Sequence, residues 1–355
     1  MLMCSRQVHK RYRFSPKIVH PNINELPRHT HHGNMATNTR SVFDKSNIFA
    51  PEVPSVWQRL RRSPTLSIAQ WLYTHQPAKS IPKPTAFPVK VVCISDTHNE
   101  QPRDLPFGDI LIHAGDLTVN GTFKELQVQL DWLSSLPHQH KIVVGGNHDL
   151  LLDQTFFSRN PRLVGLANEK QLQELRWGSI IYICRSSATL DVRGRSYRVY
   201  GNPMTPQYGN WAFQYPDKED IWSNTVPEGT DILVTHGPAR GHLDSSPSNP
   251  SYLHGCAHLQ REIWRAKPQL HVCGHIHSAR GVEQRSWFWL EWGYDAVCRD
   301  DRRVGIVLML SAWVWSWVLY VLGRERKATM TSVNAAVVGG QGLVEGEKTL
   351  IVDLA

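Results

Sequence analysis

Residues 141–149 read Lys-Ile-Val-Val-Gly-Gly-Asn-His-Asp, an apolar, β-branched run that ends in a turn with polar side chains. A continuous apolar run of this length is typical of a strand buried on both faces of a sheet. Gly-Asn is also a common turn dipeptide, so the segment alone has a purely structural interpretation. The rest of the chain decides between turn and functional site.

Four further apolar runs end in a similar way. The runs 89–95, 109–113, 231–234 and 269–273 lead into Asp96-Thr97-His98, Gly115-Asp116, Thr235-His236-Gly237-Pro238 and Gly274-His275-Ile276-His277. Between the second and third of the five runs, residues 123–136 place leucines at helical spacing, so strands and helices alternate there. Open sheets of this kind place their chemistry beyond the carboxyl ends of the strands. We therefore expect the five motifs to converge at one sheet edge.

The residue types in these motifs suit a pair of divalent cations. Such cations take carboxylate, amide oxygen and imidazole ligands, and two ions about 3.5–4 Å apart need two ligand shells that share a carboxylate. Each short motif also recurs by chance in capping or core roles, and Asn147 is the weakest candidate alone. Five motifs in order, each after an apolar run, favour metal binding.

The ordered set D-x-H, G-D, G-N-H-D, H and G-H-x-H resembles the pattern of the calcineurin-like metallophosphoesterases. The segments 200–203, 211–213, 235–244, 254–256, 268–271 and 333–336 are similar to the branch of metallophosphoesterase domain-containing proteins. The resemblance covers residues 89–294 and 328–355. It implies an α/β fold, a four-layer α-β-β-α sandwich of two mixed sheets, here with a hydrophobic helical insert.

The resemblance also implies a role for each motif residue. The residues that would hold the first metal are Asp96, His98 and His277, those for the second are Asn147, His236 and His275, and the bridge between them is Asp116. His148 would act as general acid toward the leaving oxygen, with Asp149 orienting its ring. The implied cofactors are two divalent ions, for which we expect Mn²⁺, with Fe or Zn²⁺ as alternatives.

Elementary chemistry agrees with these roles. Two cations clamp the phosphate oxygens and lower the pKa of a bridging water, which gives the hydroxide that attacks phosphorus. An imidazole that protonates the leaving alkoxide adds about 10²–10⁴-fold. The family resemblance implies a phosphoester hydrolase that acts on small phosphodiesters, cyclic nucleotides among them. The sequence shows no Arg-rich clamp for a doubly charged monoester, and Arg240 near His236 decides little. The alternatives are a phosphomonoesterase or protein phosphatase, and a membrane-docked scaffold without catalysis.

Composition and charge place limits on the rest of the chain. The net charge of +8 is concentrated at the amino terminus, where residues 1–40 carry seven Lys or Arg and one acid. The remainder is nearly neutral, so we expect no specific nucleic-acid binding. We predict a basic flexible tail over 1–47 and short helices with a proline-rich linker over 48–88. Six cysteines without paired spacing favour an intracellular reducing compartment, cytoplasmic or membrane-associated.

Residues 304–322 form an uncharged run of nineteen residues that contains three tryptophans. This length can span the ~30 Å core of a bilayer. If 333–336 and 349–353 complete the same sheet as the earlier strands, both flanks lie on one side, which argues against a single span. We expect an insert over 295–327 that interrupts the domain of 89–294 plus 328–355. Docking of 304–322 on a membrane or a partner is favoured over a buried helix.

Overall fold

The computed structural model describes residues 53–81, 87–160, 169–246, 249–299, 302–324, 326–339, 342–343 and 349–354. The tail predicted over 1–47 lies outside the described residues. Five cysteines fall within the described part of the chain, and all five are free thiols.

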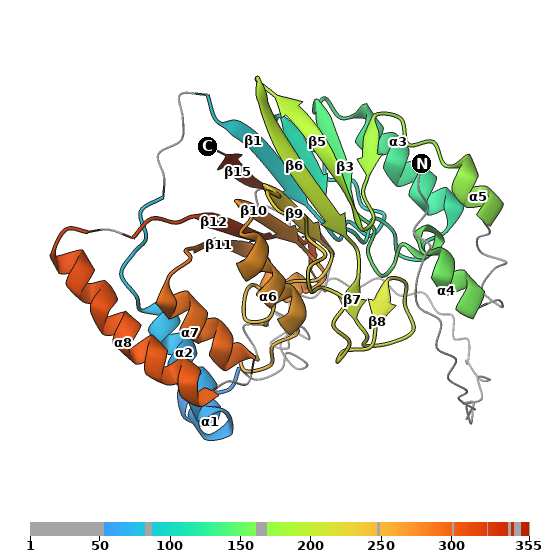
Figure 1. Ribbon diagram of the computed structural model, residues 1–355. Helices are drawn as coiled ribbons and strands as arrows, with labels where there is room; N and C mark the ends of the chain where they lie inside the picture. The colour runs from blue at the N-terminus through green and yellow to red at the C-terminus, as the bar shows by residue number, and fades with distance from the viewer. Residues whose placement is uncertain are drawn as a thin grey trace, which may run out of the picture. The chain divides into compact units, whose positions relative to one another are not determined.

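The first sheet contains five strands in the order β15-β1-β2-β3-β4 (Figure 1). Strands β1 to β4 are parallel, and β15 closes one edge antiparallel to β1. The strands are β1 (Val89–Ile94), β2 (Ile110–His113), β3 (His140–Val143), β4 (Ile180–Tyr182) and β15 (Leu350–Leu354).

The second sheet contains six strands in the order β11-β12-β10-β9-β6-β5. Its four central strands are parallel, and the edge strands β11 and β5 are antiparallel to their neighbours. The strands are β5 (Ser186–Val192), β6 (Arg195–Asn202), β9 (Ile232–Thr235), β10 (Leu270–Cys273), β11 (Gly281–Arg285) and β12 (Met330–Asn334).

The two sheets pack face to face with helices outside them, which confirms the predicted four-layer α/β sandwich. Alternate residues of β1 show how the layers form, because Val91 contributes to the core between the sheets while Val92 contributes to the core under helix α3 (Phe123–Ser135). Helix α6 (Ala257–Ala266) covers the outer face of the second sheet. The shorter elements are η1 (Leu150–Leu152), α4 (Gln154–Arg159), α5 (Glu169–Glu174), β7 (Thr205–Pro206), β8 (Gln214–Tyr215), η3 (His277–Ala279), β13 (Val338–Gly339) and β14 (Gly342–Leu343).

Helix α3 shows how local sequence sets an element between two motifs. Thr122 and Glu125 form a reciprocal capping box that begins the helix, and the helix ends before Pro137. Leu126, Leu130 and Leu133 recur at three- and four-residue spacing and are buried. The helix therefore returns the chain from the end of β2 to the start of β3, so that both strands run in the same direction.

Four helices form a separate group beside the second sheet. Helix α2 (Pro64–Thr74) packs on α7 (Trp289–Cys298) and α8 (Arg302–Val321), and α1 (Val56–Arg62) packs on α2. Helices α7 and α8 approach closely, because a Cβ atom at Gly293 would lie 3.0 Å from the carbonyl oxygen of Gly305. Among the described helices, only α8 is apolar and long enough to pass as a membrane span, on length and composition alone.

The expectation that 333–336 and 349–353 complete one sheet needs correction. Val333 and Asn334 of the first segment lie in β12 of the second sheet, and Ala336 forms an isolated bridge with Ser95 after β1, whereas the second segment belongs to β15 in the first sheet. The sequence of a short apolar strand does not indicate which sheet the strand joins. Both sheets are part of one sandwich, so both flanks of α8 still return to the same folded body.

Candidate metal centre

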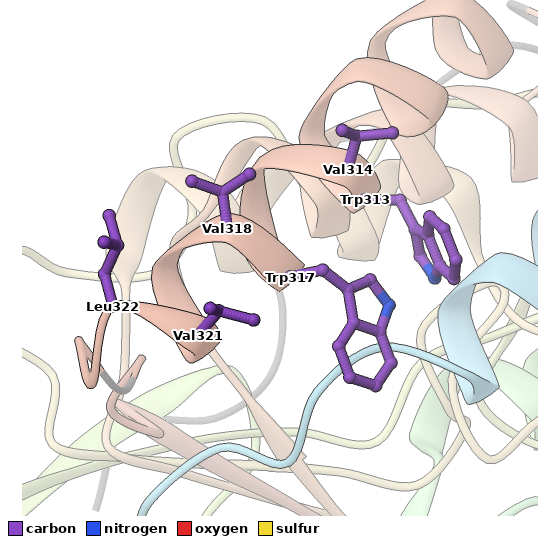
Figure 2. A pocket seen from close by; sticks show the side chains of 6 residues that line it. All are labelled: Trp313, Val314, Trp317, Val318, Val321 and Leu322. Atoms are coloured by element: carbon purple, nitrogen blue, oxygen red, sulfur yellow. The ribbon is translucent and has the colours of Figure 1, made fainter.

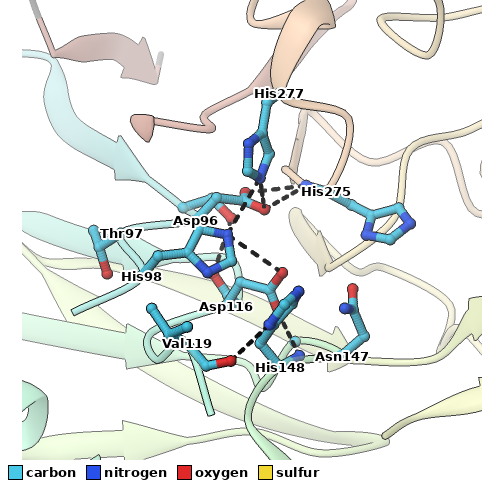
Figure 3. A network of polar contacts seen from close by, with 12 residues as sticks. Asp96, Thr97, His98, Asp116, Val119, Asn147, His148, His275 and His277 are labelled. Carbon is cyan, nitrogen blue, oxygen red and sulfur yellow. Dashed lines mark hydrogen bonds and ion pairs between the residues drawn. The ribbon is translucent and has the colours of Figure 1, made fainter. Parts of the chain in front are cut away.

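The loops after β1, β2, β3, β9 and β10 meet at one edge of the sandwich, as the motif order predicts (Figure 3). The structure brings together all seven predicted ligand residues there, and it places His148 beside them. Their individual roles as ligands remain predictions. Asp96, Asp116, Asn147 and His236 are almost completely buried.

One cluster of ligand atoms comes from Asp96, His98 and His277. The Nε2 atom of His277 lies 3.2 Å from Oδ1 of Asp96 and 3.3 Å from Nε2 of His98. The backbone N–H of His275 donates to both carboxylate oxygens of Asp96 at 3.0 Å. These three side chains are the residues predicted for the first metal.

The second cluster comes from Asp116, His236 and His275. The Nε2 atom of His236 lies 3.4 Å from Oδ2 of Asp116 and 3.0 Å from Oδ1 of Asn147. Asp116 also lies next to the first cluster, with Oδ2 3.8 Å from Nε2 of His98. A carboxylate between two clusters of imidazoles is the arrangement that a bridging ligand requires.

The backbone at the site adopts unusual conformations. Asp96, His98, Asp116 and His275 have positive φ angles of 54°, 44°, 55° and 68°. Non-glycine residues rarely adopt this region, and such strain gathers at functional sites where the surrounding structure enforces it. The loops are also tightly packed, because a Cβ atom at Gly146 would lie 2.3 Å from Oδ1 of Asp116. The glycines of the motifs are therefore needed for close approach.

Hydrogen bonds to backbone carbonyls orient two of the ligand imidazoles. The Nδ1 atom of His98 donates to the carbonyl oxygen of Thr118 at 3.1 Å, and that of His236 donates to Ala114 at 2.9 Å. A neutral ring that donates from Nδ1 presents a lone pair at Nε2. In the second cluster the Nε2 atom of His236 faces Oδ1 of Asn147, and it presents its lone pair there once the ring gives up the proton that Asp116 and Asp96 favour. Convergent acceptors of this kind fit a bound cation.

The electrostatics of the clusters also fit cations. Burial and the neighbouring His236 lower the pKa of His275 to about 3, so its ring is neutral and able to bind metal. Burial raises the pKa of Asp116, but His236 and other imidazoles outweigh that effect and hold its pKa below the ordinary value. The carboxylate of Asp116 and the ring of His275 are therefore in the protonation state that a divalent ion requires. Burial lowers the pKa of His236, but Asp116 and Asp96 outweigh it and raise that pKa to about 9, so this ring releases a proton when metal binds.

The predicted role of Asp149 is wrong in one respect. The Nδ1 atom of His148 donates to the carbonyl oxygen of Val119 at 2.8 Å, and it is this bond that orients the ring. The Asp149 carboxylate instead accepts from the backbone N–H groups of Gly146, Leu117 and Thr118, at 2.8, 3.2 and 3.0 Å. Adjacent side chains in a tight turn point apart, so Asp149 ties two loops together while His148 faces the cluster.

Two aromatic residues join the site without having been predicted for it. Trp211 packs its ring on His148 with centroids 4.3 Å apart, and Tyr208 lies over His275 at 5.2 Å. Trp211 belongs to a segment that resembles the family, but its sequence suggests no role, and Tyr208 has no motif around it. Both come from the loop between β7 and β8, whose position depends on the tertiary fold.

The comparisons with known proteins agree with this geometry. A family model described as calcineurin-like phosphoesterase matches residues 89–279. A probable rhamnogalacturonate lyase C of Emericella nidulans is 40% identical over 309 residues, which is 85% of this chain and 28% of that protein. Human metallophosphoesterase domain-containing protein 1 is 40% identical over 216 residues, 57% of this chain and 64% of that protein.

A UPF0046 protein of Caenorhabditis elegans is 36% identical over 202 residues, 55% of this chain and 65% of that protein. The chain thus spans less than two thirds of the length of each of these relatives. The family model nevertheless matches more than half of the chain, over the strands β1 to β6, β9 and β10 of the two sheets and the five motif loops. The chain therefore belongs to the calcineurin-like phosphoesterase family.

Proposed function

We propose that this protein is a metal-dependent phosphoesterase that prefers phosphodiesters, with two divalent ions held by the paired clusters. The observation that carries the proposal is the position of Asp116, whose carboxylate lies 3.4 Å from Nε2 of His236 and 3.8 Å from Nε2 of His98. When bound, two such ions neutralise phosphate oxygens and lower the pKa of an attacking water. The relatives named phosphoesterases support the same activity.

The chain's own residues supply the remaining chemistry. A ring nitrogen of His148 lies within 4.8 Å of ligand atoms of His98 and Asp116, at the border of the clusters. Since the carbonyl of Val119 binds Nδ1, the proton that His148 transfers to the leaving oxygen comes from Nε2. The backbone N–H of His148 donates to Oδ1 of Asp116 at 2.8 Å, which fixes the acid relative to the bridging carboxylate.

Two features favour diesters over monoesters. The Arg240 guanidinium donates to the backbone carbonyls of Cys298 and Leu253, at 2.7 and 3.2 Å, and is thus committed to structure instead of to a doubly charged phosphate. The rings of Tyr208 and Trp211 flank the clusters and offer stacking surfaces for a substrate with a planar group. A cyclic nucleotide combines a diester with such a group.

Hydrolysis of two chromogenic esters tests this function. Purified protein is assayed with bis-p-nitrophenyl phosphate and p-nitrophenyl phosphate, each with added Mn²⁺ and with chelator. We expect chelator-sensitive turnover that is faster with the diester. Faster turnover of the monoester would indicate that the protein is a phosphatase and not a diesterase. No turnover of either ester with metal bound would indicate a scaffold without catalysis.

A further inference from the structure

Helix α8 has one apolar face buried and a second apolar face exposed. Met309, Ala312 and Ser316 face the helix group and are at most 5% exposed. Val307, Val314 and Val321 recur at multiples of seven residues, share the other face, and are 65%, 58% and 81% exposed. Figure 2 shows Val314 projecting from α8 beside an open depression lined only by apolar side chains. An apolar face of this size is rarely left in contact with water alone, and such faces usually bind a membrane or another protein.

The neighbouring helices also expose tryptophans. Trp57 of α1, Trp71 of α2 and Trp289 of α7 are all more than half exposed. Trp71 contacts Trp313 of α8, with ring centroids 6.0 Å apart, so α2 and α8 contribute to one continuous surface. Indole rings are enriched where apolar and polar phases meet, because the ring combines a large apolar body with one N–H donor.

Among the described residues, the charges at the surface of the helix group have one sign. Helices α1, α2 and α8 contain no acidic residue, and the two acids of α7, Glu291 and Asp295, are completely buried. Glu291 pairs with Lys79 at 2.7 Å and Asp295 pairs with Arg285 at 3.1 Å. The exposed charges of the described residues in these helices and just after α8 are therefore basic: Arg61, Arg62, Arg324 and Lys327.

The sequence around the helices agrees with this sign. Residues 53–81 carry four Lys or Arg and no acid, and residues 299–327 carry six against three acids. An exposed apolar face that is bordered by basic groups complements a surface of apolar chains beneath anionic headgroups. From this complementarity we propose that the exposed face of α8, with α1, α2 and α7, docks the protein on an anionic membrane.

The packing of α8 determines how it would lie. Its buried face is held against α7 and α2, and β12 follows it within the sandwich, so α8 stays with the folded body. The helix therefore lies parallel to the lipid surface and inserts only its outer face. Nothing in this proposal depends on the phosphoesterase activity, because the docking face and the metal clusters share no residue.

Vesicle co-sedimentation of the full chain tests the docking. The protein is mixed with phosphatidylcholine vesicles, with and without phosphatidylserine, at low and high salt. The variant Val314→Glu/Val321→Glu places charges on the docking face. The matched control Phe107→Glu/Val128→Glu adds the same charges at exposed apolar positions outside the helix group.

We expect the native chain and the control to sediment with the anionic vesicles, less at high salt, and the α8 variant to partition at least about tenfold more weakly. Ester hydrolysis by the same preparations verifies folding and separates docking from catalysis. The proposal is overturned if the native chain stays in the supernatant with both vesicles, or if both variants lose binding equally. It is also overturned if a dimer of the native chain is dissociated by the α8 variant, because a second copy would then cover this face.

Discussion

The Nε2 atom of His236 lies 3.0 Å from Oδ1 of Asn147, although the Nδ1 atom of His236 already donates to a backbone carbonyl. Asp116 and Asp96 outweigh burial and raise the pKa of His236 to about 9, so without metal the Nε2–H group donates to Oδ1 of Asn147, and a cation that binds here replaces this proton. The pair therefore links metal binding to proton release in the folded protein.

Divalent metal should raise the stability of the folded protein. Because the clusters are assembled only in the folded chain, Mn²⁺ at one hundred times its dissociation constant is expected to add about 2.7 kcal/mol per site to the free energy of unfolding. Thermal unfolding with chelator and with Mn²⁺ measures this effect. An unchanged Tm in the native chain would argue against the clusters as metal sites, and Asp116→Asn should greatly reduce the shift.

The variant His148→Ala should lose activity without losing metal. The side chain is proposed to protonate the leaving group, so kcat should fall by about 10²–10⁴-fold while the metal content stays that of the native chain. A matched control is His140→Ala, at the opposite end of β3. Activity assays paired with metal analysis check the prediction, and a variant that keeps full turnover would remove His148 from the mechanism.

The variant Asp149→Asn separates two roles for that carboxylate. The structure shows it accepting four hydrogen bonds that join the loops after β2 and β3. An amide leaves some of these buried donors without an acceptor, which should cost about 1–3 kcal/mol in the free energy of unfolding. Urea denaturation measures the loss. If the variant instead keeps the stability of the native chain while its kcat falls as far as that of His148→Ala, then Asp149 acts by orienting the ring of His148.

The ring of Tyr208 should contribute to substrate affinity. Stacking of a base on an aromatic side chain is worth about 1–3 kcal/mol, so Tyr208→Ala should raise KM for a cyclic nucleotide by roughly 5- to 150-fold. The variant Tyr208→Phe retains the ring and should retain KM. Steady-state kinetics with both variants check this, and an equal loss in both would assign the effect to the hydroxyl group.

A buried ion-pair network predicts how stability changes at alkaline pH. His242 lies 3.0 Å from Glu283 and 2.6 Å from Asp295. Burial and Arg285 lower the pKa of His242, but the two carboxylates outweigh them and raise it to about 9. Since this lies above the ordinary value of 6.5, the stability contributed by charged His242 is complete below pH 6.5 and lost as pH rises through 9.

The variant His242→Gln isolates this effect. The difference in the free energy of unfolding between the native chain and the variant should shrink as pH rises from 6.5 to 9. Urea denaturation across this range measures it, with exposed His75→Gln as the control. A difference that stays constant would show that His242 is not charged in the folded protein.

The parts of the fold that local patterns encode were predictable. The apolar runs before the motifs became β1, β2, β3, β9 and β10, and residues 123–136 became α3, because burial on both faces and helical spacing are visible in a short window. The assignment of β12 and β15 to different sheets was not predictable, since it depends on which neighbours are free to pair.

The candidate site was also predictable only where local sequence patterns encode it. Motif order anticipated that Asp96, Asp116 and His236 would converge, because strand ends meet at one edge. The contact between His148 and Val119 and the approach of Trp211 depend on loop conformations, which no periodic pattern records. The exposed face of α8 could likewise not be predicted from the sequence, because an evenly apolar helix does not show which side will be buried.

Anomalous scattering from crystals grown with Mn²⁺ tests the paired clusters most directly. We predict two peaks, one beside Asp96, His98 and His277 and one beside Asn147, His236 and His275, with Asp116 contacting both ions. A single peak, or a second peak away from Asp116, would contradict a two-metal centre in this protein.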